Sequence, residues 1–131
     1  MVKKIILTTI FIIMVTFVDT VYAEQYHTSS VNFKRIGISD GLSQGAVQDI
    51  VQDSDGYMWF ATEDGLNKYD GVNFKFYRYS EDPKMGLSSN WIVDIIEDKS
   101  EQMWVATTAG VNVIDTSTEI INTYTEKDGL S

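Results

Sequence analysis

The sequence contains the same unit twice, and this duplication constrains the fold more than any other feature. When the chain is shifted against itself by 45 residues, Gly41-Leu42-Ser43 falls on Gly86-Leu87-Ser88, and about 14 of the 39 positions from 41 to 79 are identical. A further step of 43 residues leads to Gly129-Leu130-Ser131, which begins a third copy. We interpret the recurring glycines, aspartates and tryptophans as structural repeat residues: Gly41, Asp53, Trp59, Gly65 and Asp70 in the first unit, and Gly86, Asp98, Trp104, Gly110 and Asp115 in the second.

Each unit contains four short apolar segments that are separated by turn sequences. Their composition predicts strands at residues 47–53, 57–62, 66–69 and 74–79, and the second unit repeats them at 92–96, 103–107, 111–114 and 120–124. Asp53-Ser54-Asp55-Gly56 is typical of a hairpin turn. The constant shift of 45 residues places Tyr79 on Tyr124 and so aligns the ends of the two fourth strands. No segment after residue 23 has the periodicity of an amphipathic helix.

Four antiparallel strands in about 45 residues are the size of one β-propeller blade. We therefore predict an all-β fold of β-propeller blades, in which two four-stranded antiparallel repeats and partial flanking repeats make an incomplete propeller. A blade buries its faces against neighbouring blades. We expect Trp59 and Trp104 to pack in such interfaces, and a platform for stacking a ligand is the alternative.

The N-terminus has the layout of a secretory signal peptide. Lys3 and Lys4 precede an apolar run at 5–18, and Val21-Tyr22-Ala23 offers small residues for cleavage, so we predict a signal peptide at 1–23 and an exported chain. An uncleaved N-terminal anchor is the alternative. The remaining organisation is predicted as a linker at 24–32 and a partial β-propeller at 33–131, divided into an outer strand at 33–40, blade 1 at 41–79, blade 2 at 86–124 and the start of the next repeat at 125–131.

Composition excludes several classes of function. The net charge of −9 argues against binding of nucleic acid, and the absence of cysteine excludes disulfides and thiolate metal sites. His27 is the single histidine and lies in the linker, so the sequence has almost no histidine from which to build a catalytic triad or a multi-histidine metal site. Asp53-Ser54-Asp55-Gly56 lacks the later ligands of a calcium loop. We therefore predict no catalytic residue, no metal, no cofactor and no enzymatic activity.

The chain resembles the two-component regulator propeller repeats in the residues 41–43, 47–53, 55–62 and 65–71. This resemblance implies the exported sensor region of a bacterial membrane receptor, such as a hybrid sensor histidine kinase or a diguanylate cyclase. It places the chain in the periplasm of a Gram-negative bacterium, with the parent receptor anchored in the inner membrane. The chain is then expected to be the N-terminal piece of a ligand-sensing propeller from a truncated or split gene, and assembly of several copies into a ring is the alternative.

Propellers bind ligands at one mouth of the central channel, which here predicts a site in the loops 63–65, 80–90 and 108–110. The candidate ligand-binding residues are Asp64, Ser89, Asn90 and Thr108, whose polar groups suit a small extracytoplasmic ligand, a carbohydrate being one candidate. The other expected partners are the remaining blades of the parent receptor or further copies of the chain. The alternative functions are a propeller-type lyase fragment and an exported binding or scaffold module.

Overall fold

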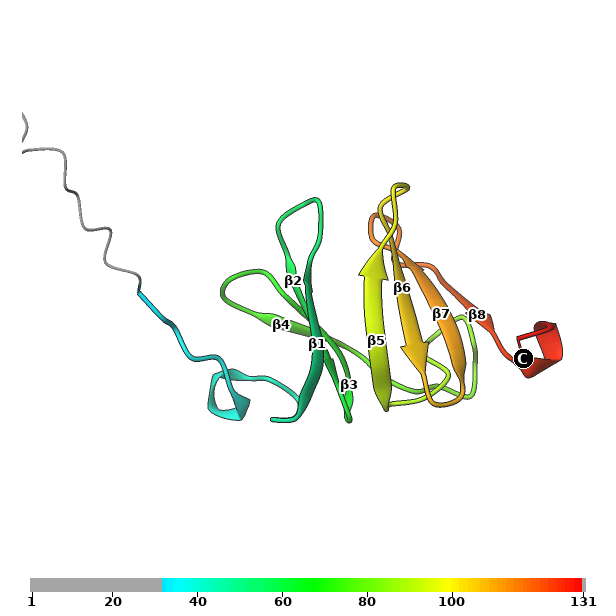
Figure 1. Cartoon of the computed structure of the whole chain (residues 1–131), viewed down its shortest axis with the longest axis horizontal. Coiled ribbons are helices and arrows are strands. Elements are labelled where there is room, and N and C mark those ends of the chain that lie inside the picture. The colour runs from blue at the N-terminus through cyan, green and yellow to red at the C-terminus, as the bar shows by residue number, and fades with distance from the viewer. Residues whose placement is uncertain (1–31, 131) are drawn as a thin grey trace, which may run out of the picture. The chain divides into compact units, whose positions relative to one another are not determined.

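The computed structural model describes residues 32–130, which form two four-stranded antiparallel sheets (Figure 1). The predicted signal peptide, His27 and all but the last linker residue lie outside the described residues. The predicted all-β fold of two four-stranded repeats is confirmed, and in each sheet the strands follow one another in chain order. Blade 1 consists of β1 (Val47–Gln52), β2 (Met58–Thr62), β3 (Gly65–Tyr69) and β4 (Phe74–Tyr77), and blade 2 of β5 (Ile92–Glu97), β6 (Gln102–Thr107), β7 (Gly110–Asp115) and β8 (Ile121–Tyr124).

The two blades repeat the same irregularities. The register shifts between Val47 and Asp49 in β1, and again between Ile92 and Asp94 in β5. In blade 1 the β2–β3 turn has only two residues, since Thr62 pairs with Gly65. Gly65 has a φ of +100°, and a Cβ built on it would lie 2.6 Å from the carbonyl oxygen of Tyr77. Only glycine therefore suits this position, which explains why it recurs at the start of β7.

The structure corrects the alignment of the two fourth strands. Leu66 pairs with Tyr77 in blade 1, whereas its equivalent Val111 pairs with Tyr124 in blade 2. The structural equivalent of Tyr124 is therefore Tyr77, and the predicted equivalence with Tyr79 is wrong. The cause is the spacing between the last paired residues: six residues lie between Ile114 and Ile121, but only four lie between Tyr69 and Phe74, so β4 ends at Tyr77.

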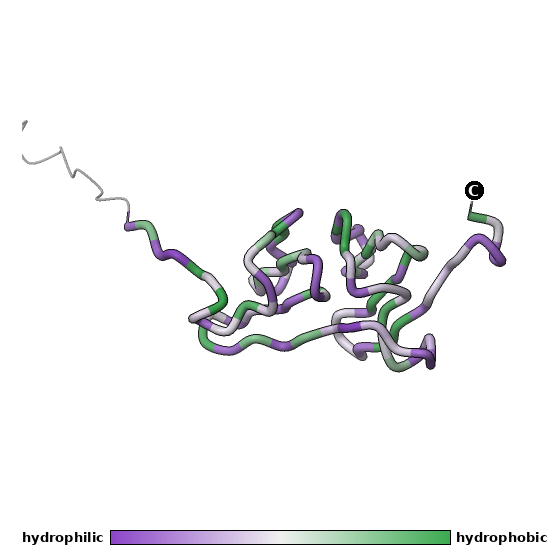
Figure 2. Tube along the Cα trace, turned by 90° about the horizontal axis from the view of Figure 1, so that it is seen from below, coloured by the Kyte–Doolittle hydropathy of each residue, from purple (hydrophilic) through white to green (hydrophobic). Residues whose placement is uncertain are grey.

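A large apolar core fills the interface between the two blades. Trp59 is fully buried there and stacks on Tyr77 with 5.5 Å between ring centroids. Figure 2 shows apolar segments in both sheets. The cluster joins Trp59, Ala61, Leu66 and Tyr77 of blade 1 to Leu87, Ile92, Ile95, Met103, Val105, Ile114 and Ile121, which belong to blade 2 or lie just before it. A second cluster lies on the other face of blade 1 and contains Leu42, Phe60 and Tyr69, with Ile36, Val47, Met58 and Phe74 packed against it.

The segment predicted as an outer strand at 33–40 forms no strand. It has no pairing partner among the described residues, and Ile38–Asp40 instead form the short 3-10 helix η2, which ends at Gly41 with a φ of +108°. The same local structure returns at η3 (Glu126–Asp128), which ends at Gly129 with a φ of +97°. The start of the third copy therefore folds locally as the start of the first does. No helix in residues 32–130 has the length and apolar character needed to cross a bilayer.

Candidate functional site

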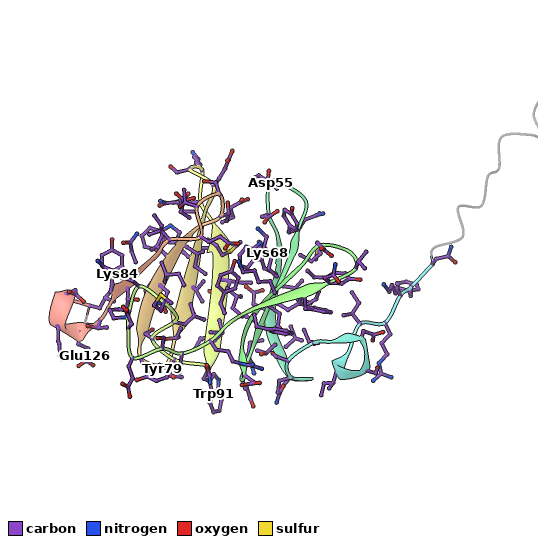
Figure 3. All side chains as sticks on the ribbon, turned by 180° about the vertical axis from the view of Figure 1, so that it is seen from behind. Asp55, Lys68, Tyr79, Lys84, Trp91 and Glu126 are labelled. Atoms are coloured by element: carbon purple, nitrogen blue, oxygen red, sulfur yellow. The ribbon has the colours of Figure 1, made fainter. Side chains whose placement is uncertain are left out.

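The structure places the four candidate ligand-binding residues at one end of the blades. Asp64 lies in the β2–β3 turn, Thr108 in the β6–β7 turn, and Ser89 and Asn90 in the connection between the blades. We call this the connection end, made of residues 63–65, 88–91 and 108–110. Figure 3 shows Trp91 at this end, and Asp55 at the opposite end in the β1–β2 turn.

Two hydroxyl groups meet at the connection end. Ser89 Oγ lies 2.9 Å from Thr108 Oγ1, although 19 residues separate them in the chain. Ser89 Oγ also accepts a hydrogen bond from the main-chain N–H of Trp91 at 3.1 Å. The structure thus brings together two of the four candidate residues, of which Thr108 is exposed and Ser89 is half-buried.

Asn90 joins the connection to blade 1. Its side-chain Oδ1 accepts the N–H of Tyr79 at 2.7 Å, and its carbonyl oxygen accepts the N–H of Gly65 at 2.7 Å. The next carbonyl, that of Trp91, accepts the N–H of Thr108 in blade 2 at 3.2 Å. Two consecutive carbonyl groups thus bond to the β2–β3 turn and to its equivalent in blade 2, the β6–β7 turn. The side-chain amide oxygen of Asn90 is held by the N–H of Tyr79, so it has a structural role.

Asp64 has a cationic partner. Arg78 Nη2 lies 2.8 Å from Asp64 Oδ2, and Arg78 Nε donates to the main-chain carbonyl of Asp64 at 3.4 Å. Both side chains are about half exposed. At this end of blade 1 the structure therefore presents an ion pair and not a lone carboxylate.

Trp91 is a functional candidate that the sequence reasoning missed. It is 50% exposed, and its main-chain N–H donates to Ser89 Oγ, one member of the hydroxyl pair. The signal was available in the repeat itself, because the shift of 45 residues places Trp91 on Ala46. A large aromatic residue at a position where the other copy has alanine is not needed for the shared fold. This makes Trp91 a candidate for a role specific to this site.

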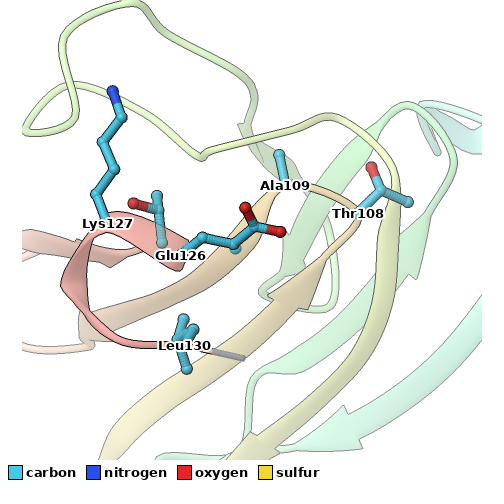
Figure 4. A pocket seen from close by; sticks show the side chains of 7 residues that line it. Thr108, Ala109, Glu126, Lys127 and Leu130 are labelled. Atoms are coloured by element: carbon cyan, nitrogen blue, oxygen red, sulfur yellow. The ribbon is translucent and has the colours of Figure 1, made fainter.

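A hollow of about 410 Å³ adjoins Thr108 on the side of η3 (Figure 4). Its lining mixes polar and apolar groups, and Glu126 and Lys127 bring one charge of each sign. The lining residues are Thr108, Ala109, Gly110, Thr125, Glu126, Lys127 and Leu130.

The recurring aspartate and tryptophan form a hydrogen-bonded pair in each blade. Trp59 Nε1 donates to Asp53 Oδ2 at 2.7 Å, and Trp104 Nε1 donates to Asp98 Oδ2 at 2.8 Å. The other oxygen of Asp53 accepts the N–H of Tyr57 across the turn at 2.8 Å. Asp53 therefore fixes both the hairpin turn and the indole, a role that its spacing alone did not indicate. The indole of Trp104, followed by the N–H of Gln102, lowers the pKa of Asp98 below its usual value.

A buried asparagine holds the Gly-Leu-Ser segment against each blade. Asn67 Oδ1 accepts the N–H of Ser43 at 2.9 Å, and Asn112 Oδ1 accepts the N–H of Ser88 at 3.1 Å. Both asparagines are fully buried. Ser88 Oγ further lies 2.8 Å from Thr107 Oγ1. The recurrence of glycine, serine and asparagine therefore reflects this internal network and not a binding site.

The β3–β4 and β7–β8 turns are each capped by an aspartate. Asp70 Oδ1 accepts the N–H groups of Val72 and Asn73 at 2.7 and 2.6 Å. Asp115 Oδ1 accepts the hydroxyl of Ser117 and the N–H of Thr118 at 2.7 and 2.9 Å. Hydrogen bonds from Ser117 and Thr118 lower the pKa of Asp115 to about 2.

Gly86 is a repeat residue of another kind. Its φ lies outside the left-handed region, but a Cβ there would contact the carbonyl oxygen of Arg78 and lie 2.7 Å from Cβ of Ser80. The connection passes so close to itself here that a side chain has no space.

Within residues 32–130 no group of three or more His, Cys, Asp or Glu side chains is placed to hold a metal ion.

This architecture defines a pair of β-propeller blades, each built as a four-stranded meander and packed face to face. Residues 41–64 and 86–109 match the family model described as two component regulator propeller. The chain therefore carries two repeats of the two-component regulator propeller family, as the sequence resemblance predicted.

Similar solved structures are extracellular domains of bacterial signalling systems. The chain is 34% identical to the extracellular domain assigned to the hybrid two-component system BT3049 of B. thetaiotaomicron, with a TM-score of 0.63 over 70% of this chain and 13% of that domain. It is 30% identical to an extracellular domain of BT4673 from the same organism, assigned there to a one-component system, with a TM-score of 0.57 over 71% of this chain and 14% of that domain. Propeller repeats of this family build sensor domains without catalytic activity, which agrees with the prediction that the blades are not an enzyme.

A curated protein is similar to part of the chain. The chain is 54% identical over 50 residues to histidine kinase P4 of Formosa agariphila. The match covers 38% of this chain and 4% of that protein. The chain thus spans a small part of the length of the relatives that it matches.

Proposed function

We propose that these blades belong to the ligand-sensing propeller of an exported receptor region. The receptor is anchored in the inner membrane of a Gram-negative bacterium, and the blades face its periplasm. Three observations support this proposal: the family of the repeats, the extracellular domains among the similar structures, and the histidine kinase among the relatives. The histidine kinase relative favours a kinase output over a diguanylate cyclase. A ligand would act by contacting two states of the receptor differently.

The observation that carries the proposal is the arrangement at the connection end. The β2–β3 turn, the β6–β7 turn and the connection meet there. The hydroxyls of Ser89 and Thr108 pair at this end, and the half-exposed Trp91 donates its main-chain N–H to Ser89 Oγ. An aromatic surface next to a few fixed polar groups is the usual composition of a site for a small organic ligand. Hydroxyls and an indole suit a neutral carbohydrate, because a sugar ring has both hydrogen-bonding groups and an apolar face.

Binding tests this site directly. The purified chain is titrated with a panel of neutral oligosaccharides, and binding is followed by calorimetry and tryptophan fluorescence. Trp91→Ala and Thr108→Val are expected to weaken binding at least tenfold. Asp55→Ala, in the β1–β2 turn at the opposite end, is the matched control and is expected to bind as the wild type does. Equal binding by all variants would contradict the proposed site, and a folded chain that binds none of the sugars would favour an exported scaffold module.

Export is tested separately with the N-terminal segment. Residues 1–31 are fused to alkaline phosphatase, an enzyme that needs the disulfides of an oxidising compartment for activity. The fusion is expected to be active in intact bacteria, whereas a fusion that begins at Glu24 is expected to be inactive. Equal activity of the two fusions would contradict export through residues 1–23.

A further inference from the structure

A hollow of about 230 Å³ lies between the two blades, at the end opposite the connection end. Figure 3 shows Lys68 in the region where the two sheets face each other. Four of the side chains that line the hollow carry a charge. The lining includes Tyr57, Lys68, Asp70, Phe74 and Lys75 of blade 1, and Glu119 of the β7–β8 turn in blade 2.

The ammonium group of Lys68 lies over two aromatic rings. Its Nζ lies 4.1 Å from the ring centroid of Tyr57 and 4.9 Å from a ring centroid of Trp59. The buried Asp53 Oδ2 lies 3.8 Å away, which is beyond hydrogen-bond distance, and it already accepts the indole N–H of Trp59. Among residues 32–130 no acceptor lies within hydrogen-bond distance of Lys68 Nζ, although this side chain is only 12% exposed. Its N–H donors are therefore available to a ligand in the hollow.

A second ammonium group lies opposite the first. Lys68 on β3 pairs with Lys75 on β4, and like charges in this arrangement destabilise a sheet. Lys75 Nζ forms an ion pair with Glu119 Oε1. Lys68 has only the more distant carboxylate of Asp53 among the described residues. A negatively charged group bound at Lys68 would therefore reduce the repulsion between the two lysines.

Glu119 brings the opposite charge from blade 2. Its Oε1 pairs with Lys75, whereas its Oε2 has no hydrogen bond or ion pair within the described part of the chain. Its backbone has a φ of +61°, a conformation that residues other than glycine seldom adopt. The turn thus keeps a glutamate at this rim in spite of its backbone conformation, and one carboxylate oxygen is available for a positive charge.

The two repeats differ at this hollow. Blade 2 forms the same four strands with other side chains at three of the lining positions, so the shared fold does not require them. Tyr57 stands where blade 2 has Gln102, Lys68 where it has Val113, and Lys75 where it has Asn122. The aromatic ring and both ammonium groups are therefore specific to this place, as Trp91 is to the connection end.

We propose that this hollow binds a free α-amino acid in its zwitterionic form. The ammonium groups of Lys68 and Lys75 and the carboxylates of Asp70 and Glu119 balance one another. A ligand with one charge of each sign keeps this balance, whereas a simple anion or cation disturbs it. The carboxylate of the amino acid accepts hydrogen bonds from Lys68, and its ammonium group donates to Glu119.

The size and the aromatic lining of the hollow indicate which amino acids fit. A water molecule occupies about 30 Å³ in the liquid, so the hollow has room for about eight of them, which suits one amino acid and not an oligosaccharide. The rings of Tyr57 and Phe74 favour an apolar side chain, such as that of leucine or phenylalanine. Because the hollow and Trp91 lie at opposite ends of the blades, this inference does not depend on the carbohydrate site.

Calorimetry with the purified chain and L-leucine tests the site. Two analogues each lack one charge: isocaproate has no ammonium group, and isoamylamine has no carboxylate. Leucine is expected to bind at least tenfold more tightly than either analogue, because each charged hydrogen bond is lost in one of them. Lys68→Met is expected to bind leucine no better than isoamylamine. Glu119→Gln is expected to bind leucine no better than isocaproate, and this variant carries the test if Lys68→Met fails to fold by circular dichroism.

Matched variants remove the same charges elsewhere. Lys99→Met in the β5–β6 turn and Glu81→Gln in the connection are expected to bind leucine as the wild type does. Trp91→Ala is also expected to retain leucine binding, which separates this site from the connection end. A folded wild-type chain that binds neither leucine nor phenylalanine would overturn the proposal. Equal affinity for leucine and both analogues would overturn it too, as would equal losses in Lys99→Met and Lys68→Met.

Discussion

Asp53 accepts the indole N–H of Trp59 at 2.7 Å, and this pair returns one repeat later as Asp98 and Trp104 at 2.8 Å. The first pair is buried between the blades, and the second is in contact with solvent. The two pairs share this hydrogen bond and differ in burial, and Asp53 also lies 3.8 Å from Lys68 Nζ, at a position where blade 2 has Val113.

Removing the carboxylate is expected to destabilise the first blade much more than the second. Asp53→Ala leaves a buried indole N–H and the N–H of Tyr57 without acceptors, and it removes the carboxylate that pairs with Lys68 Nζ at 3.8 Å. Together these losses are expected to cost about 2–3 kcal/mol of unfolding free energy. Asp98→Ala exposes its donors to water and is expected to cost about 1 kcal/mol. Urea unfolding of both variants at one protein concentration measures the difference. Equal losses would show that the buried hydrogen bond has no special weight.

Alanine substitutions at two glycines distinguish the stability cost of backbone strain from the cost of steric crowding. Gly65 and Gly71 have φ values of +100° and +99°, but a Cβ on Gly65 would lie 2.6 Å from Tyr77 O, while one on Gly71 would meet nothing within 4 Å. Gly71→Ala is expected to cost about 1 kcal/mol for its left-handed backbone. Gly65→Ala adds a steric clash in a packed region and is expected to cost about 3 kcal/mol or more. The difference in denaturant midpoints checks this, and similar midpoints would contradict the packing at the β2–β3 turn.

Stability is expected to fall at acidic pH because three turn and hairpin aspartates have lowered pKa values. Hydrogen bonds lower the pKa of Asp115 to about 2 from the usual 3.8, and those of Asp70 and Asp98 also lie below 3.8. A lowered pKa in the folded state stabilises it above pH 3.8, and the contribution is lost as pH falls towards 2. Unfolding midpoints measured between pH 5 and pH 2 are expected to decrease, and Asp115→Asn is expected to flatten this decrease. A carboxyl NMR titration of Asp115 with its midpoint near 3.8 would contradict the prediction.

The ion pair of Lys75 and Glu119 is expected to contribute little to holding the blades together. It links β4 to the β7–β8 turn, but both side chains are about half exposed. A double-mutant cycle with Lys75→Met and Glu119→Gln is expected to give a coupling energy below about 1 kcal/mol. The coupling should decrease further in concentrated salt. A larger value that is insensitive to salt would show that water is excluded from the pair.

The fold could be predicted because short-range sequence patterns mark each strand and each turn. Apolar alternation and turn residues predict seven of the eight strands to within one residue at each end, and the eighth, expected at 74–79, ends two residues earlier at Tyr77. A slip of two residues keeps every side chain on the same face of a strand, so the apolar pattern cannot distinguish these two positions. Only the length of the preceding turn decides between them.

The candidate site could be predicted only in outline. Strand order places Asp64, Asn90 and Thr108 at one end of the blades, and the structure agrees. The partners of these residues depend on contacts between distant segments, such as Arg78 with Asp64, for which the sequence has no local signal. The burial of a recurring residue also depends on its neighbour, so Trp59 and Trp104 have the same sequence context and different exposure.

The paired carbonyl bonds of Asn90 and Trp91 have a mechanical consequence. Because one carbonyl accepts the N–H of Gly65 and the next accepts the N–H of Thr108, the segment links the β2–β3 hairpin to the β6–β7 hairpin. A displacement of these two residues is therefore expected to be felt by both hairpins at once.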